Sequence, residues 1–304
     1  MPADVASVLV DGPWQHRLVS ANGARFHVAE LGEGPLVLLL HGFPQFWWAW
    51  RDQLPALADA GYRAAAMDLR GFGASDKPPR GYDTFTLAAD AASVVRSLGA
   101  SSAVVVGHGM GAWIAWSMPS MQPDVTRAIA TLAMPHPLAL RRAGAVLHPR
   151  QLRSHTRLAG LQRPSVPERQ MTRDSRYVAR LLRGWSAPGS GWPPGDVVQR
   201  YADAMALPFV AHSAAEYYRW VVRSQWRSDG RRFRNRLART IGVPVLHVRG
   251  GVDRAVARGS GGGSDRFVSG PFEEHVLDGV GHFVHEEAPD AVNGLLLPWL
   301  DRLP

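Results

Sequence analysis

The sequence predicts an α/β protein with a mostly parallel, doubly wound sheet and an inserted helical cap. Apolar runs of strand length alternate with helical patterns from Pro35 to Leu132, and such alternation is typical of a parallel sheet covered by helices on both faces. A segment rich in arginine and proline follows, and the strand pattern then returns. We therefore expect a core formed by residues 1–136 and 241–304, interrupted by a cap at residues 137–240.

The first part of the predicted core begins with a hairpin and continues with alternating strands and helices. Apolar residues alternate between Arg17 and Val28 around Asn22-Gly23, a pair typical of two-residue hairpin turns. This hairpin is expected at the antiparallel edge of the sheet. The further strands are predicted at residues 35–41, 62–67, 103–106 and 126–132, and the helices at residues 50–60, 85–98 and 112–121.

The second part of the core is shorter. Strands are predicted at residues 242–249 and 272–277, and a closing helix at residues 291–300.

The composition limits the class of protein. The chain has 304 residues, 46% of them hydrophobic, and no cysteine, which excludes disulfides, thiolate metal sites and a cysteine nucleophile. No apolar run reaches the roughly eighteen residues of a membrane span, and residues 1–4 lack the pattern of a signal peptide. We expect a cytoplasmic protein that uses neither a metal nor a cofactor.

The basic residues are unevenly distributed. Between Arg141 and Arg239 the sequence has 20 arginines and six acidic residues. One interpretation is a solvated helical surface whose arginines reflect coding bias; the other is an anionic ligand or surface as partner. No nucleic-acid recognition motif accompanies the charge, so we expect no nucleic-acid partner.

The stretch from Val104 to Ala112 predicts a strand, a tight glycine turn and a helix. A turn of this kind presents the side chain of its central residue above the sheet, and the residues that flank it must be small. Gly107 and Gly111 fill the small positions, and Gly109 lies at the centre. The sequence thus has the turn that usually carries a nucleophile, with no nucleophile in it.

Other strand ends provide polar groups. Ligands bind at the carboxyl ends of the strands in such sheets, and the backbone N–H groups of Phe43 and Met110 are expected there as a pair of donors for an oxyanion. Asp253 and His282 follow the last two predicted strands. An acid and a histidine in this order are expected to form a hydrogen-bonded general base.

These features resemble those of the α/β-hydrolase superfamily and, within it, the epoxide hydrolases. The resemblance covers nearly the whole chain and is carried by the motifs at residues 41–47, 68–75, 106–108 and 281–283. It implies that an aspartate at position 109 would attack an epoxide carbon and that water activated by Asp253 and His282 would hydrolyse the resulting ester. It also implies that cap tyrosines donate to the epoxide oxygen.

Two positions depart from the pattern of the family. Gly109 stands in place of the aspartate, and Tyr218 matches one cap tyrosine, whereas no tyrosine occurs near residues 161–164, where the other is expected. We expect Tyr218, His41 and Trp47 to contact the substrate. Core packing is the alternative for Trp47, Trp48, Trp113 and Trp116.

Three functions stay open. The first is an epoxide hydrolase-like protein for a small apolar or amphipathic substrate, whose nucleophile Gly109 has replaced. The second is an enzyme in which His282 and Asp253 act as a general base without a covalent intermediate. The third is a binding protein that uses the pocket under the cap for a ligand and the arginine-rich cap for an anionic surface.

Overall fold

A computed structural model describes residues 4–144, 160–173, 175–256 and 262–304. It contains an eight-stranded sheet in the order β1-β2-β4-β3-β5-β6-β7-β8. The pairs β1–β2 and β2–β4 are antiparallel, and all other neighbouring strands are parallel. The strands are β1 (Gln15–Ala21), β2 (Ala24–Leu31), β3 (Leu36–Leu40), β4 (Arg63–Met67), β5 (Ala103–His108), β6 (Thr126–Leu132), β7 (Val245–Gly250) and β8 (Phe272–Leu277). The predicted mostly parallel sheet is therefore confirmed.

The predicted hairpin forms the antiparallel edge. β1 and β2 pair from Gln15 with Glu30 to Ala21 with Ala24, and the turn residues Asn22 and Gly23 have φ angles of 44° and 74°. A type I′ turn requires positive φ at both positions, which Asn and Gly adopt most easily.

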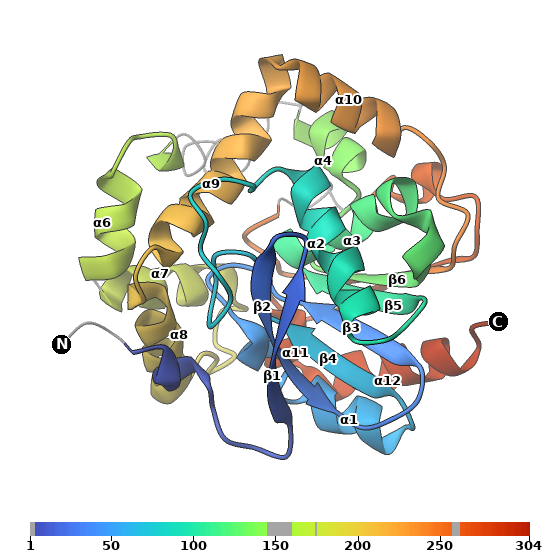
Figure 1. Cartoon of the computed structure of the whole chain (residues 1–304), viewed down its shortest axis with the longest axis horizontal. Coiled ribbons are helices and arrows are strands. Elements are labelled where there is room, and N and C mark those ends of the chain that lie inside the picture. Colours follow the sequence, from blue (N-terminus) through green and yellow to red (C-terminus); the bar gives the residue numbers. More distant parts are fainter. Residues whose placement is uncertain (1–3, 145–159, 174, 257–261) are drawn as a thin grey trace.

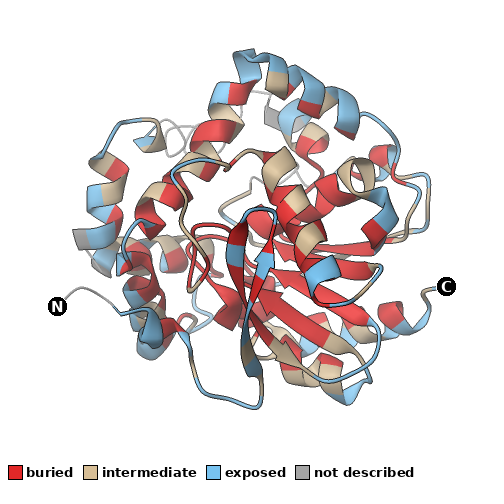
Figure 2. Ribbon diagram, in the orientation of Figure 1, coloured by how far each residue is buried: buried red, intermediate tan, exposed pale blue. Residues whose placement is uncertain are grey.

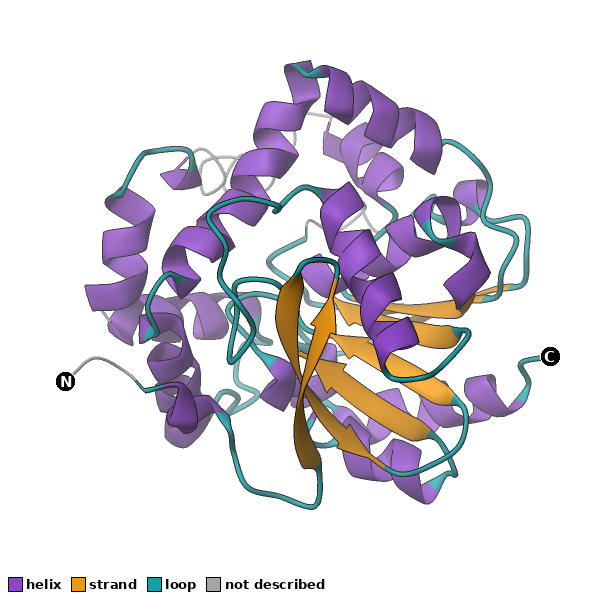
Figure 3. Ribbon diagram, in the orientation of Figure 1, coloured by secondary structure: helices purple, strands orange, loops and turns teal. Residues whose placement is uncertain are grey.

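Helices cover both faces of the sheet (Figures 1 and 3). α2 (Thr84–Ser97) and α3 (Met110–Met121) lie on one face, where α3 packs against β5 and β6. On the other face α1 (Gln53–Asp59) packs against β4, and α12 (Pro289–Asp301) packs against α1 and β7. Every residue of β3 and β5 is consequently buried, as the continuous apolar runs predict (Figure 2).

The described residues between β6 and β7 form helices and contain no strand (Figure 3). The helices are α4 (Pro137–Gly144), α6 (Val166–Arg173), α7 (Ser175–Trp185), α8 (Gly195–Ala206), α9 (Val210–Arg223) and α10 (Ser228–Leu237). They form a cap region beside the loops that follow the strands: the Tyr217 hydroxyl donates to the Arg70 carbonyl at 2.9 Å, and the His282 N–H donates to the Trp185 carbonyl at 3.0 Å. The limits 137 and 240 stay a prediction, and residues 145–159 of the predicted cap lie outside the described residues.

No helix in the described parts of the chain is both long enough and apolar enough to span a membrane.

Candidate active site

The turn between β5 and α3 brings Gly109 to the carboxyl edge of the sheet. Gly107 and Gly111 permit this turn, because a Cβ at Gly107 would overlap the Gly111 carbonyl and a Cβ at Gly111 would overlap the Leu40 carbonyl. Gly109 itself has φ 54° and ψ −113°, and its N–H donates to the Leu132 carbonyl at 3.1 Å. The predicted strand, turn and helix are confirmed, although the helix begins at Met110, two residues before the predicted start.

The Cβ position of Gly109 meets two neighbouring atoms at van der Waals distance and overlaps none. A Cβ built on it would lie 3.6 Å from Gly42 Cα and 3.6 Å from His282 Nε2, both ordinary van der Waals distances. A Cβ at this position would therefore fit beside the imidazole of His282, at the cost of the backbone strain that a φ of 54° imposes on any residue other than glycine.

The structure brings Asp253 and His282 together. Nδ1 of His282 lies 2.9 Å from Oδ2 of Asp253, and the two side chains are only 4% and 8% exposed. Oδ1 of Asp253 also accepts from the N–H groups of Ala255 at 2.7 Å and Val256 at 3.1 Å, which fixes the carboxylate. Because the carboxylate can only accept, Nδ1 carries the proton and the lone pair of Nε2 faces Gly109. This is the arrangement of a general base.

Two backbone donors flank the turn. Among the described residues, neither the Phe43 N–H nor the Met110 N–H has an acceptor, and Met110 is the first residue of α3, where helical N–H groups have no partner within the helix. Both residues line a narrow cavity together with Gly42, Leu69, Phe72, Ala214, Tyr217 and Tyr218. Apart from the two phenols, its side chains are apolar.

Tyr218 and Tyr217 differ in what their hydroxyls do. The Tyr217 hydroxyl donates to the Arg70 carbonyl, whereas the Tyr218 hydroxyl has no hydrogen-bond partner in the described parts of the chain, and its ring packs edge-on against Phe43 at 5.7 Å. Burial, and the nearby hydroxyl of Tyr177, raise the pKa of Tyr218. The phenol thus keeps its proton at neutral pH and can donate it to a ligand.

Comparisons with known proteins agree with this geometry. A family model described as the alpha/beta hydrolase fold matches residues 35–289. The chain belongs to the α/β-hydrolase family. Within this family it is epoxide hydrolase-like: it is 31% identical to Epoxide hydrolase A of Mycobacterium tuberculosis, over 94% of this chain and 97% of that protein. It is also 30% identical to the AB hydrolase superfamily protein YfhM of Bacillus subtilis, over 93% of this chain and 97% of that protein.

Solved structures give the same result. An epoxide hydrolase from an endophytic Streptomyces superposes with a TM-score of 0.82 at 31% identity and covers 96% of both chains. Epoxide Hydrolase A from Mycobacterium thermoresistibile gives a TM-score of 0.81 at 26% identity, over 96% of this chain and 99% of that one. The predicted α/β-hydrolase fold and epoxide hydrolase-like family are confirmed.

Two of the expected substrate contacts in this α/β-hydrolase have other partners. His41 is fully buried; its Nδ1 donates to the Gly42 carbonyl at 2.8 Å and its Nε2 accepts the Leu69 N–H at 3.1 Å. Trp47 is also fully buried, and its Nε1 donates to the Val8 carbonyl at 2.7 Å. Neither residue lines the cavity around Phe43 and Tyr218. Both hold the loops that surround the site.

The other tryptophans of interest pack in the interior. Trp113 stacks on Phe233 with the ring centroids 5.6 Å apart, and Trp116 donates to the Met134 carbonyl at 2.9 Å. Trp48 stacks under the guanidinium of Arg51 at 4.0 Å.

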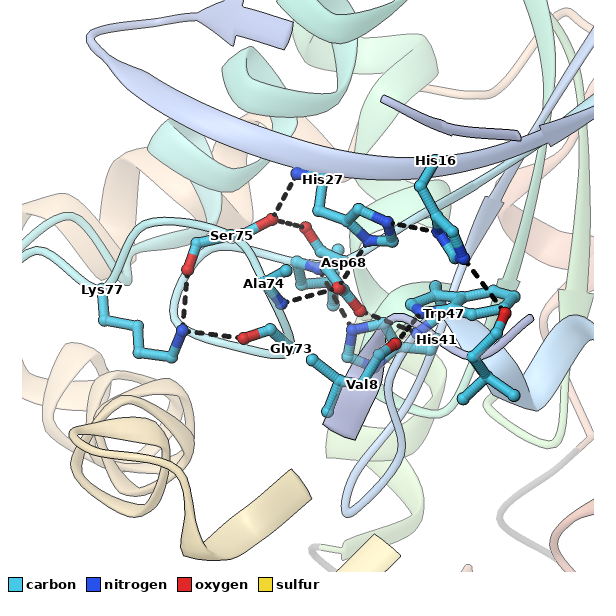
Figure 4. Close-up of polar contacts among 12 residues, drawn as sticks. Val8, His16, His27, His41, Trp47, Asp68, Gly73, Ala74, Ser75 and Lys77 are labelled. Carbon is cyan, nitrogen blue, oxygen red and sulfur yellow. Dashed lines mark hydrogen bonds and ion pairs between the residues drawn. The ribbon is translucent and has the colours of Figure 1, made fainter. Parts of the chain in front are cut away.

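Asp68 organises the glycine-rich loop next to the site (Figure 4). Its Oδ2 accepts from His27 Nδ1 at 2.8 Å and from the Ala74 N–H at 2.9 Å, and its Oδ1 accepts from the Trp47 N–H at 2.8 Å. Burial alone would raise the pKa of Asp68, but the hydrogen bond and charge of His27, the charge of His41 and the Trp47 N–H together outweigh it and hold the pKa below its usual value. Asp68 is thus committed to structure and is not a substitute nucleophile.

Sequence reasoning missed a buried polar cluster that supports the His282 loop. The ring of His108 lies between two acceptors, with Nε2 3.0 Å from the His282 carbonyl oxygen and Nδ1 2.8 Å from Gln45 Oε1. Gln45 also donates to the carboxyl group of Glu286, which accepts from Arg51 at 2.6 Å and from Tyr201 at 2.7 Å as well. No local pattern reveals this cluster, because its members come from distant segments.

A second missed residue is Tyr177 in α7. Its effect on the pKa of Tyr218 places it near that phenol, although it lies well after residues 161–164, where a second cap tyrosine was expected. The loss of the second cap tyrosine near residues 161–164 stays a prediction.

Among the described residues there is no group of three or more His, Asp or Glu side chains that could hold a metal ion.

Proposed function

We propose that this protein is an epoxide hydrolase-like enzyme for a small apolar or amphipathic substrate, in which Gly109 has removed the covalent first step. The apolar lining of the cavity next to Phe43 and Met110 supports an apolar or amphipathic substrate, and Tyr218 supplies a phenol for its oxygen. The observation that carries the proposal is the 3.6 Å distance between His282 Nε2 and a Cβ at Gly109. The base thus faces the position from which a carboxylate would attack.

The test is to install the missing group. Gly109→Asp should hydrolyse members of a panel of small epoxides at least a thousand-fold faster than the unaltered chain, because removal of a nucleophile costs about a million-fold in a comparable hydrolase. Gly109→Asn is the matched control, since it has nearly the same volume and no carboxylate. A folded Gly109→Asp variant that hydrolyses no epoxide of the panel would contradict the proposal.

A second candidate function is direct hydrolysis by the unaltered chain, with His282 as a general base on water. It is favoured by the buried lone pair of His282 Nε2, which faces the Cβ position of Gly109, and by the carboxylate of Asp253, which is fixed on the other side of the ring. General-base catalysis of this kind contributes about a hundred- to ten-thousand-fold. If the unaltered chain has measurable turnover of epoxides or activated esters, His282→Ala should lower it by that factor. An unchanged rate would exclude this mechanism.

A third candidate is binding to an anionic lipid surface through α10 and the turn before it. Residues 223–239 contain seven arginines and one acidic residue, Asp229, whose carboxylate accepts from Trp220 Nε1. Near the start of this segment Trp226 is 79% exposed. An exposed tryptophan among arginines is typical of segments that lie in a membrane interface.

Vesicle co-sedimentation tests this candidate. Binding to vesicles with anionic lipid should fall with rising salt, because each arginine near the surface contributes about 1 kcal/mol. Trp226→Ser should weaken it, whereas Phe209→Ser, at an aromatic residue outside the segment that is 71% exposed, should not. Equal binding to neutral vesicles would remove the candidate.

A further inference from the structure

We infer that Gly109 forms a binding site for a small carboxylate anion, formate above all, and that this anion supplies the nucleophile that the chain lacks. This inference rests on the proposed function, because the reaction it completes is epoxide hydrolysis. The binding site itself stands on the geometry around Gly109.

The backbone provides the donors for an anion. The N–H groups of Phe43 and Met110 have no acceptor among the described residues. Met110 opens α3, a helix of 12 residues, and the positive end of the helix dipole therefore lies at Gly109. A carboxylate oxygen in front of these donors would be stabilised by two hydrogen bonds and by the dipole.

A buried side chain points into the same space from the opposite direction. His282 is 4% exposed, its Nδ1 is held by Asp253, and its Nε2 has no partner among the described residues while lying 3.6 Å from the Cβ position of Gly109. Protonated Nε2 would donate to an anion, and neutral Nε2 would accept from a water next to it. Asp253, the nearby negative charge, lies behind the imidazole ring.

Contact distances from Gly109 Cα rank the possible anions. An aspartate carboxylate carbon lies two covalent bonds from Cα, about 2.5 Å away, whereas a free anion must stay about 3.5 Å from that atom. The carboxylate of formate must therefore lie about 1 Å farther from Cα than that of an aspartate. The carboxylate of acetate must lie roughly 2 Å farther, because the methyl group also has to clear Cα. We therefore expect formate to be preferred over acetate, and acetate over propionate.

The chemistry balances with formate as co-reactant. A formate oxygen attacks an epoxide ring carbon, the ring C–O bond breaks, and the ring oxygen takes the proton of Tyr218. This leaves the formate ester of a diol. His282 then takes a proton from water, the hydroxide attacks the formyl carbon, and the acyl C–O bond breaks. The departing alkoxide receives the proton of the formic acid, and the proton on His282 returns to Tyr218 through solvent. The net reaction is epoxide plus water to diol.

The decisive experiment traces the oxygen atoms of formate into the diol by isotope labelling. An epoxide that Gly109→Asp hydrolyses is given to the unaltered chain with sodium formate labelled with ¹⁸O at both oxygens, or with sodium sulfate at equal ionic strength. Formate should raise turnover roughly tenfold or more, and the diol should carry one ¹⁸O atom, because the acyl bond breaks and the attacking oxygen stays with the carbon. Hydrolysis by water under general-base control would give unlabelled diol.

A binding measurement with formate alone separates the possible failures. Formate should raise the thermal midpoint of the unaltered chain and not that of Gly109→Asp, whose own carboxylate fills the site. If Gly109→Asp is active but formate neither binds nor labels the diol, the inference is overturned and the proposed function stands. Formate that binds without labelling the diol overturns its role as nucleophile. If Gly109→Asp is inactive, the proposed function fails, and absence of the thermal shift then overturns the anion site as well.

Discussion

Gly109 and His282 face each other, and Nε2 of His282 lies 3.6 Å from the position that a Cβ at residue 109 would take. Oδ2 of Asp253 lies 2.9 Å from Nδ1 on the far side of the imidazole. The backbone of His282 is fixed as well, because its carbonyl contacts His108 and its N–H donates to the Trp185 carbonyl. The mechanism proposed above therefore keeps its second step, activation of water by His282, next to a residue that has no side chain for the first step.

The three glycines of this turn are expected to differ in their tolerance of a side chain. Gly109→Ala should lower the free energy of unfolding by about 1–3 kcal/mol, the cost of a left-handed backbone at an alanine, because its φ is 54° and its Cβ meets only ordinary contacts. Gly107→Ala and Gly111→Ala would overlap backbone carbonyls that cannot move aside, and we expect both to lose more than about 4 kcal/mol or fail to fold. Urea unfolding measures the series, and equal losses at all three positions would contradict it.

The buried carboxyl group of Glu286 is expected to join the cap to the core. Tyr201→Phe removes the hydrogen bond that α8 donates to it at 2.7 Å, and the free energy of unfolding should fall by about 1.5–3 kcal/mol. Tyr62→Phe is the matched control, because the Tyr62 hydroxyl also donates to a carboxylate, Asp301, but at the surface and at 3.0 Å. Its loss should stay below about 0.5 kcal/mol. Similar losses in the two variants would show that Glu286 has no special role.

Much of this site could be predicted because the signals are local. Gly107, Gly109 and Gly111 stand within one turn, and Asp253 and His282 each follow a strand whose parallel neighbours bring both to the same edge of the sheet. The pattern of apolar runs was enough to place these ends together.

The errors occur where side-chain direction or distant packing decides. His41 follows β3 as the site requires, but its ring turns to the Gly42 and Leu69 backbone. The influence of Tyr177 on Tyr218 crosses from α7 to α9, and the cluster around Glu286 joins segments up to 241 residues apart. No periodicity in the sequence encodes these contacts.

Asp68 is expected to be indispensable for the loop in Figure 4. Its oxygens accept from the backbone of Trp47 and Ala74 and from His27. Asp68→Asn replaces one of these acceptors by an amide N–H that faces another donor, and we expect a loss of about 3 kcal/mol in the free energy of unfolding.

Asp76→Asn is the control for this change, since Asp76 is 37% exposed and pairs with Arg25 at the surface. Its loss should be below about 1 kcal/mol. Denaturant unfolding of the two variants compares them, and a mild effect of Asp68→Asn would show that the loop is held without its carboxylate.

His136 is expected to make the fold sensitive to mild acid. Its ring is buried between Phe267, stacked at 4.2 Å, and Trp116, and burial lowers its pKa to about 3. Because the folded state disfavours the protonated ring, the stability that this residue contributes is present above the unfolded pKa of about 6.5 and is lost progressively as the pH falls from there to about 3. At pH 5 the loss should be about 2 kcal/mol relative to pH 7.5. His136→Phe keeps the stacking but cannot take up a proton. Between pH 7.5 and pH 5 its free energy of unfolding should therefore fall by about 2 kcal/mol less than that of the unaltered chain. Parallel pH curves for the two proteins would refute the buried neutral ring.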